Sequence, residues 1–408
     1  MKGPIGLVRS MSTTEYSNVG PLFEWQDGDS YLIIDEVNHR GKPGAILCYQ
    51  NPPMHQVSTI GLYAYHDGLD KVLERLENLD FLILYGPNDP VHSGGDLKES
   101  RSNLQRTLNE KQEMESNGAT DEEVDTLFNW GEDRLRKGII LYDKIRRAAE
   151  QIRVVGICGG GLRFGGSAEI QLMADYLVGD SRSGFCFSEA MIGIIPGWAG
   201  MARALTKAGL ANAEYMTKTA REVGAASLEQ IGIYNEVVDI PFKFPGRIKS
   251  SDPKRDRKEY QELLEKHDYE TGLHLLPKGL EMATCPEQEI PRKEGKSRMN
   301  MASREQISEE VAVRINPENY AHIRRQSLRE IREEISTLGR PLAPQSIKAL
   351  DYLLEIFNPS TYEEKSFIEQ ELKADAALYR DPKFLEGLTA MLEQRVPDFR
   401  EPGDEKME

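Results

Sequence analysis

The chain has 408 residues, of which 39% are hydrophobic and 29% are charged, and its formal net charge is -16. This composition predicts a globular protein with a sizeable core and a polar surface. The acidic balance argues against non-specific binding to nucleic acid, which needs a basic surface. Because no run of 18 apolar residues occurs, we also expect no membrane-spanning helix and no membrane partner.

The spacing of the cysteines and the N-terminal residues indicate the cellular compartment of the protein. The four cysteines form no CxxC pair and no zinc-finger spacing with histidine, so we expect reduced thiols and no metal site. The N-terminal stretch lacks the long apolar region of a signal peptide. Together these features predict a cytoplasmic protein.

Short apolar segments bounded by turn residues predict strands. The predicted strands cover 30–37, 45–49, 81–86, 152–158, 175–180, 184–190 and 234–240. Helical spacing of apolar residues separates several of them, over 58–79, over most of 98–150 and from about Ala202 onward. Strands that alternate with helices predict an α/β fold.

Changes in composition predict the domain organisation. We expect an N-terminal extension over 1–29, a core over 30–240 with a helical insertion at about 101–140, a charged and mostly helical insertion over 241–340, a C-terminal helical region over 341–400, and a disordered tail over 401–408. The start of the second insertion is basic, with seven lysines and arginines between Lys243 and Lys258. This basic run is either a solvated face or a surface for phosphate groups.

The stretch "LRFGGSAEIQLMAD" (162–175) places small residues in front of Glu169 and then continues in a helical pattern. Glu169 is either an ordinary charge at a helix start or a catalytic base beside backbone amides. The glycines lack the spacing of a dinucleotide fingerprint, and no lysine follows Gly166 as a phosphate-binding loop requires. Ser167 departs from the nucleophile-elbow pattern, which argues against serine-hydrolase chemistry.

Four segments taken together resemble the crotonase superfamily, the enoyl-CoA hydratase/isomerase family. In family order they are "VHSGGDLKE" (91–99), "RVVGICGGGLRFGGSAEIQLMAD" (153–175), "GFCFSEAMIGIIPGWAGMARAL" (184–205) and "EGLTAMLEQRVPDF" (386–399). The resemblance covers roughly 31–240 and 360–399. It implies an α/β spiral of ββα units with C-terminal helices, which acts on an acyl-CoA thioester.

The resemblance also implies roles for individual residues. Two backbone N–H groups, of Ser93 and Gly166, would stabilise the thioester enolate, and Glu169 and Glu189 would act as acid and base. Further contacts to substrate and CoA would come from His92, Gly94, Gly95, Asp96, Leu97, Gly165 and Trp198. No metal or redox cofactor is implied, since coenzyme A is part of the substrate.

This sequence departs from the family pattern at several positions. The substituted positions are Gly160 in the Asn-Gly pair, Ser167 in the glycine triplet, Ser188 before the second glutamate, and Met391 and Gln394 near the C-terminus. In relatives those C-terminal residues help to hold the CoA nucleotide, so we expect the nucleotide contacts to differ here. The extra length at 101–140 suggests a larger or cyclic acyl group.

The favoured reaction is syn hydration of a 2-enoyl-CoA, or the reverse dehydration. Alternatives within the superfamily are double-bond isomerisation, thioester hydrolysis and C–C bond hydrolysis in a cyclic ketone. A non-catalytic or RNA-binding scaffold is the alternative of another class, against which the net charge and the two glutamates argue. Each glutamate alone also fits a surface charge, and each glycine loop alone fits a tight turn. From the family we expect a homotrimer or hexamer.

Overall fold

The computed structural model describes residues 4–11, 15–244, 253–291 and 299–400. The chain divides into two compact units. We call the first the sheet unit, which comprises Met1–Gly94, Ile140–Cys186 and Glu222–Met299. The second is the helical unit, which comprises Gly95–Ile139, Phe187–Arg221 and Asn300–Glu408.

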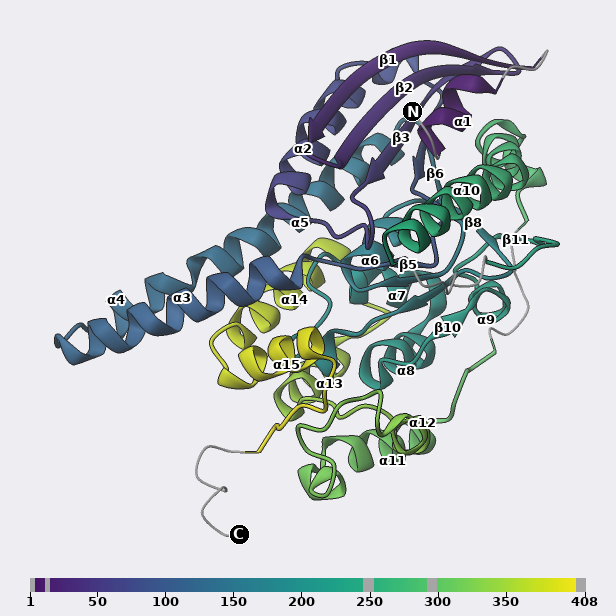
Figure 1. Cartoon of the computed structure of the whole chain (residues 1–408). Helices are drawn as coiled ribbons and strands as arrows, with labels where there is room; N and C mark the ends of the chain where they lie inside the picture. Colours follow the sequence, from purple (N-terminus) through teal and green to yellow (C-terminus); the bar gives the residue numbers. More distant parts are fainter. Residues whose placement is uncertain (1–3, 12–14, 245–252, 292–298, 401–408) are drawn as a thin grey trace. The chain divides into compact units, whose positions relative to one another are not determined.

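The sheet unit contains a seven-stranded sheet in the order β1-β2-β3-β4-β6-β8-β11 (Figure 1). Its strands are β1 (Tyr16–Asp27), β2 (Ser30–His39), β3 (Lys42–Gln50), β4 (Phe81–Tyr85), β6 (Arg153–Cys158), β8 (Tyr176–Asp180) and β11 (Glu236–Val238). The first three pair antiparallel, and every later pairing is parallel. All five residues of β4 are buried, because central parallel strands are covered on both faces.

A second sheet of four short strands runs in the order β10-β9-β7-β5. These strands are β5 (Val91–His92), β7 (Leu162–Phe164), β9 (Gly184–Cys186) and β10 (Val223–Gly224). Each of β4, β6 and β8 in the large sheet is followed along the chain by one strand of the small sheet. Repeated strand pairs with intervening helices form the predicted α/β arrangement of ββα units.

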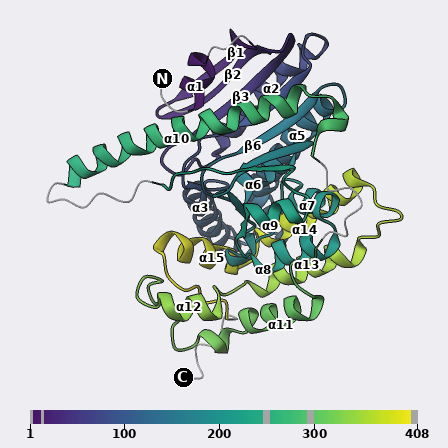
Figure 2. The same cartoon turned by 90° about the vertical axis from the view of Figure 1, so that its right-hand side faces the viewer.

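Helices cover both faces of the large sheet. On one face α1 (Pro4–Ser10) and the long α10 (Pro253–Thr284) pack against it, and α10 crosses β4, β6 and β8 (Figure 2). On the other face lies α2 (Thr59–Leu73), where Gly68 lies close to Ile34. Ile33, the neighbour of Ile34, belongs to the core beneath α10, as the alternation of side chains along a strand requires. The remaining helices of this unit are α6 (Gly166–Leu172) and α9 (Ala225–Gln230).

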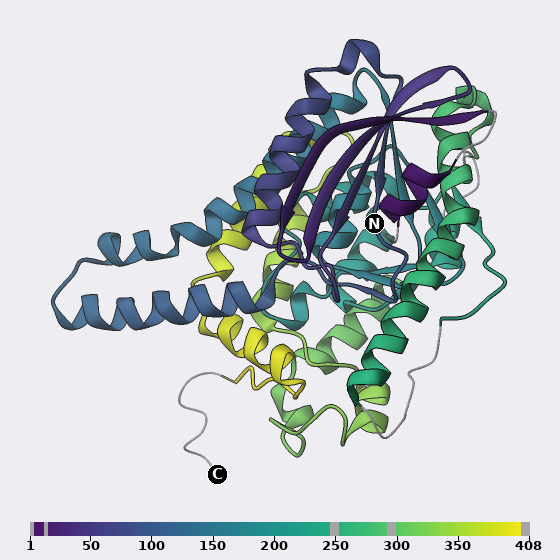
Figure 3. The same cartoon turned by 45° about the horizontal axis from the view of Figure 1, so that its top comes forward.

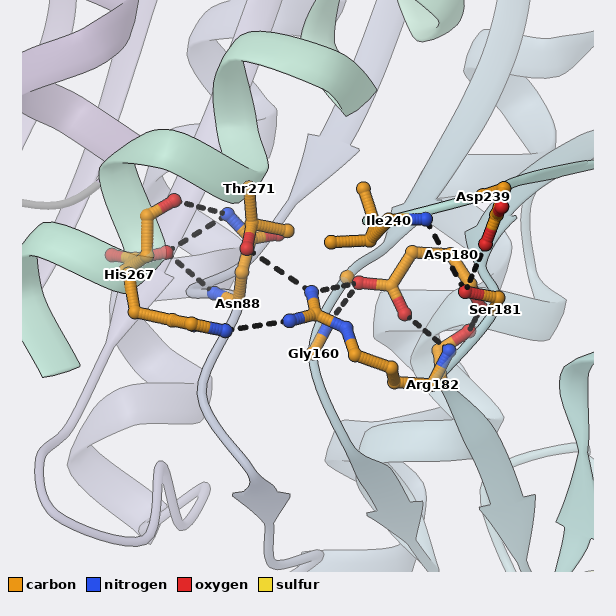
Figure 4. Close-up of polar contacts among 12 residues, drawn as sticks. Asn88, Gly160, Asp180, Ser181, Arg182, Asp239, Ile240, His267 and Thr271 are labelled. Atoms are coloured by element: carbon orange, nitrogen blue, oxygen red, sulfur yellow. Dashed lines mark hydrogen bonds and ion pairs between the residues drawn. The ribbon is translucent and has the colours of Figure 1, made fainter. Parts of the chain in front are cut away.

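A buried polar network attaches α10 to the strand ends. Arg182 donates to Asp180 at 2.6 Å, to Thr271 of α10 at 3.0 Å and to the His267 ring at 2.6 Å (Figure 4). Burial and the neighbouring Arg182 lower the pKa of His267 to about 4, so its ring is neutral and accepts this bond. The insertion is therefore held in the core through specific hydrogen bonds.

The helical unit is built from helices on three separate segments of the chain. They are α3 (Leu97–Ser116), α4 (Asp121–Asp125), the first part of α5 (Asn129–Ala149), α7 (Gly200–Ala208), α8 (Leu210–Thr219), α11 (Arg304–Ile315), α12 (Arg332–Leu338), α13 (Pro344–Ile356), α14 (Glu364–Leu378) and α15 (Pro382–Glu393). Figure 3 shows α3 alongside the segment that contains α4. The Asp96 side chain starts α3, since it accepts from the N–H groups of Lys98 and Glu99.

The structure bears out most predicted elements and corrects others. The predicted strands at 30–37, 45–49 and 81–86 are present, and the predicted C-terminal helical region over 341–400 contains α13, α14 and α15. The predicted N-terminal extension over 1–29 contains a strand that was not predicted, because Tyr16–Asp27 pairs along the whole of β2. The tail and most side chains of the basic run lie outside the described residues. Within the described ranges, no helix combines the length and the apolar character needed to span a bilayer.

Candidate functional site

The two glycine-rich segments of the sheet unit lie next to each other. β5 pairs in parallel with β7, with His92 opposite Arg163, and the Ser167 hydroxyl donates to the Ser93 carbonyl. A Cβ atom added at Gly94 would lie 2.7 Å from the Gly166 nitrogen. Only glycine fits at position 94, because any side chain would collide with the backbone at the start of α6.

The Ser93 amide has a partner within the chain. Its N–H donates to the Met54 carbonyl at 2.8 Å, while the Gly94 carbonyl accepts from the Val57 N–H at 2.9 Å. In this arrangement the Ser93 N–H group is engaged within the chain, and its role toward a thioester oxygen stays a prediction. The two glycines that follow Ser93 carry the next N–H groups along the same loop.

Glu169 lies in the first turn of α6 and is buried, with 3% of its surface exposed. Its backbone N–H donates to the Gly165 carbonyl at 3.0 Å, and Gly165 adopts a positive φ of 48°, which favours glycine. Glu189 begins the short 3-10 helix Glu189–Met191 of the helical unit and is also buried. Neither glutamate is a surface charge, so that alternative is excluded for both. That the two glutamates act as acid and base stays a prediction.

Two other predicted contact residues have structural roles in the helical unit. The Asp96 carboxylate caps α3, and Trp198 is buried against α5, where a Cβ added at Gly138 would lie 1.9 Å from the indole ring. Gly95 lies against the Arg134 guanidinium, which pairs with Glu99 at 3.2 Å. Leu97 is the first residue of α3. Their contacts with CoA stay predictions.

Gly159, Gly160 and Gly161, which precede β7, are glycines because a neighbouring loop packs closely against their backbone. A Cβ added at Gly159 would lie 1.8 Å from the Asn88 side-chain oxygen, and one at Gly161 would lie 1.7 Å from the Pro90 carbonyl. The Gly161 N–H also donates to the Asp89 carbonyl at 2.9 Å. At Gly160 the family pattern has asparagine. Here the loop of residues 88–90 packs directly against this backbone and leaves no space for a side chain.

A cavity of about 40 Å³ lies in the sheet unit beside this site. Ser167, the residue after Gly166, lines it together with His92. Sequence reasoning missed two further residues of its wall, Arg163 and His55. The sequence could have pointed to Arg163, because it is a charged residue between two apolar residues in the segment "LRF".

Hydrogen bonds at both ring nitrogens fix the orientation of His55, and His92 lies beside it. The His55 Nε2 lies 2.7 Å from a carboxylate oxygen of Asp89, and the Asn51 N–H donates to His55 Nδ1. Nδ1 is thus the acceptor and Nε2 carries the proton. The His55 ring stacks on His92 with centroids 5.1 Å apart. Burial, followed by the nearby Arg163 and His55, lowers the pKa of His92 well below its ordinary range, so His92 is neutral near pH 7.

Comparisons with known proteins bear on this arrangement. The family model described as enoyl-CoA hydratase/isomerase matches residues 142–240. A curated relative from Rhizobium meliloti (strain 1021), named "Probable enoyl-CoA hydratase", is 32% identical over 78 residues. That match covers 19% of this chain and only 30% of the relative's length.

Two solved structures that are named enoyl-CoA hydratases are similar to this chain. An enoyl-CoA hydratase from Rhodobacter sphaeroides 2.4.1 is 16% identical, covers 90% of this chain and 92% of its own, and has a TM-score of 0.52. An enoyl-CoA hydratase from Mycobacterium avium subsp. paratuberculosis K-10 is 13% identical, with coverages of 88% and 95% and a TM-score of 0.46. The first of these supports the predicted spiral of ββα units.

Proposed function

We propose that this chain is an enzyme of the crotonase superfamily, the enoyl-CoA hydratase/isomerase family, and that it hydrates a 2-enoyl-CoA or catalyses the reverse dehydration. The observation that carries the proposal is a buried carboxylate, Glu169, in the first turn of a helix whose opening amide belongs to Gly166. A carboxylate kept out of solvent beside a backbone N–H group suits proton transfer next to a developing negative charge.

The enolate of the thioester would be held by backbone N–H groups. The Gly166 N–H is the first of α6, and the first N–H groups of a helix have no partner within that helix. Since the Ser93 N–H is engaged by Met54, we assign the second donor to Gly94 of the same unit. Glycine at these positions lets the thioester oxygen approach the main chain closely.

The proton transfers would fall to glutamates. Hydration needs one group that takes a proton from water and one that gives a proton to the α-carbon. Glu169 is our choice for the base at the water. Glu189 is the proposed second group, and its assignment rests on the resemblance of "FSEA" to the family motif.

Replacing Glu169 by glutamine tests the proposal. Glutamine keeps the side-chain size but cannot exchange a proton, and a general acid or base contributes roughly 10²–10⁴-fold. We therefore expect Glu169→Gln to lose about that factor in kcat with a short 2-enoyl-CoA. Mass spectrometry would identify hydration as the gain of one water without release of CoA.

The matched control is Glu150→Gln, an exposed glutamate at the end of α5 in the same unit. This control should keep normal turnover. Circular dichroism and melting would show that both variants fold. Full activity of a folded Glu169→Gln enzyme would end the hydratase proposal, whereas release of free CoA would favour thioester hydrolysis instead.

A further inference from the structure

We propose that the cavity beside Ser167 binds a carboxylate carried by the acyl group, so that the substrate is the CoA monothioester of a short unsaturated dicarboxylic acid. This inference rests on the proposed function, and it adds a class of substrate to it. Its basis is the buried Arg163 of the sheet unit, whose Nη2 group makes no hydrogen bond to the described residues.

Arg163 is almost fully enclosed, with 2% of its surface exposed. Its Nη1 donates to the Gly159 carbonyl at 3.0 Å. Its Nη2 is buried and has no hydrogen-bond partner among the residues that the structure describes. Within the same described ranges, no ion pair is formed by this guanidinium, whereas the half-buried Arg182 of the same unit pairs with Asp180 at 2.6 Å.

A buried cation without a counter-charge is unfavourable, because the desolvation of the ion is not offset. The surrounding titratable groups do not supply the missing charge. His92 is kept neutral by burial, and His55 already faces Asp89. Tyr65 and Tyr85 also line the cavity, and burial raises the pKa of both hydroxyls well above the ordinary value, so both stay neutral. None of the residues that line the cavity therefore carries a negative charge opposite Arg163.

A second buried polar atom, on His92, lies at the same cavity. The Nε2 atom of His92 is buried and has no partner among the described residues. Gly86 marks where the two groups meet, since a Cβ added there would lie 3.9 Å from both Arg163 Nη2 and the His92 ring. A polar ligand in this position would contact a charged donor and an imidazole nitrogen at once.

Size and position select the ligand. About 40 Å³ is close to the volume of one or two water molecules, which a carboxylate group matches and a ring does not. The cavity wall includes Ser167, one residue from Gly166, where the thioester oxygen is proposed to bind. An acyl chain anchored at Gly166 would thus need only a short reach to place a terminal carboxylate beside Arg163. Guanidinium is also the side chain best suited to carboxylate.

The test compares two thioesters of equal length, one that ends in a carboxylate and one that ends in a methyl group. We expect the wild-type enzyme to prefer the carboxylate-bearing 2-enoyl-CoA in kcat/KM by about 10–100-fold, as expected when one charged group recognises its counter-ion. In Arg163→Met this preference should fall to near one. Arg75→Met, at a half-exposed arginine of the same unit, is the matched control and should keep the preference.

The outcomes separate this inference from the proposed function. Hydration of both thioesters at equal kcat/KM would overturn the carboxylate subsite while the hydratase proposal stands. Hydration of neither, together with thermal protection of wild type but not of Arg163→Met by the carboxylate-bearing thioester, would support the subsite and reject the reaction. Equal thermal protection by chloride alone, without a carboxylate preference, would mean a small-ion or water site and would overturn the proposal. If Arg163→Met does not fold, Arg163→Lys provides the same comparison, with a reduced preference expected.

Discussion

A buried aspartate makes the stability of the protein depend on pH. Asp268 of α10 is buried, and one of its carboxylate oxygens accepts from the Asn88 N–H at 2.7 Å and from the Asn88 side-chain amide at 2.8 Å. Burial, with a further contribution from Asp89, raises the pKa of Asp268 from 3.8 to about 8. The folded protein therefore keeps a proton at neutral pH that the unfolded chain has released.

The sign and size of the effect follow from this pKa. Between pH 3.8 and about 8 the folded state binds one more proton than the unfolded state, so stability falls as pH rises through this window. Each unit of pKa difference corresponds to about 1.4 kcal/mol. Above about pH 8, the raised pKa of Asp268 therefore lowers the free energy of unfolding by on the order of 6 kcal/mol. Below the lower end of the window this loss is absent, because both states are protonated.

Replacing Asp268 by asparagine removes the ionisation and keeps an oxygen that can accept from Asn88. We expect Asp268→Asn to match the wild type within about 1 kcal/mol near pH 4 and to exceed it by about 5 kcal/mol at pH 8. Urea unfolding at several pH values measures this difference. Glu262→Gln, at an exposed position of the same helix, should shift stability by less than about 0.5 kcal/mol at every pH. Parallel stability curves for wild type and Asp268→Asn would refute the reasoning.

Three further results are expected. Gly94→Ala should lose at least about 100-fold in turnover, because its Cβ would press on the Gly166 amide, while Gly224→Ala, which has open space around the added atom, should remain near normal. Glu189→Gln should lose roughly 10²–10⁴-fold, and combining it with Glu169→Gln should cost less than the product of the two losses if both carboxyls serve one reaction; a Glu189→Gln enzyme with full activity would remove it from the mechanism. Light scattering should give a trimer or hexamer, and a monomer at micromolar concentration would contradict the family-based prediction.

Local sequence patterns predicted the central part of the fold because those patterns are strong there. The run "FLILY" can only be a buried strand at that length, and β4 occupies it from Phe81 to Tyr85. The helix that follows Gly165 was also predictable, since small residues precede a helical apolar pattern. In these segments local preference and burial point to the same structure.

β1 was missed because its sequence gives mixed signals. Gly20 and Pro21 interrupt the strand pattern, and the ladder to β2 shifts its register on either side of them. Pairing along β2 supplies the hydrogen bonds that local preference does not predict. β5 and β10, with two residues each, are too short for any periodicity to appear.

The candidate site was predictable by residue type but not by contact. That Glu169 is buried follows from its position on α6, and the family motif pointed to it. The engagement of the Ser93 amide by Met54 joins residues 39 positions apart in the chain, which no local pattern reveals. The meeting of Arg163 with His92 likewise depends on the parallel pairing of β5 with β7.

The charged insertion has a function in the fold that its composition conceals. One face of α10 carries Leu275, Leu276 and Leu280 into the core of the large sheet, so the helix completes that core. Through Asp268 the same helix also holds Asn88, which opens the loop that leads into β5 and Gly94. That loop packs in turn on the glycine triplet before β7. The path from α10 to the proposed oxyanion loop is therefore continuous through packed backbone, and weakening the Asp268–Asn88 contact should disturb turnover as well as stability.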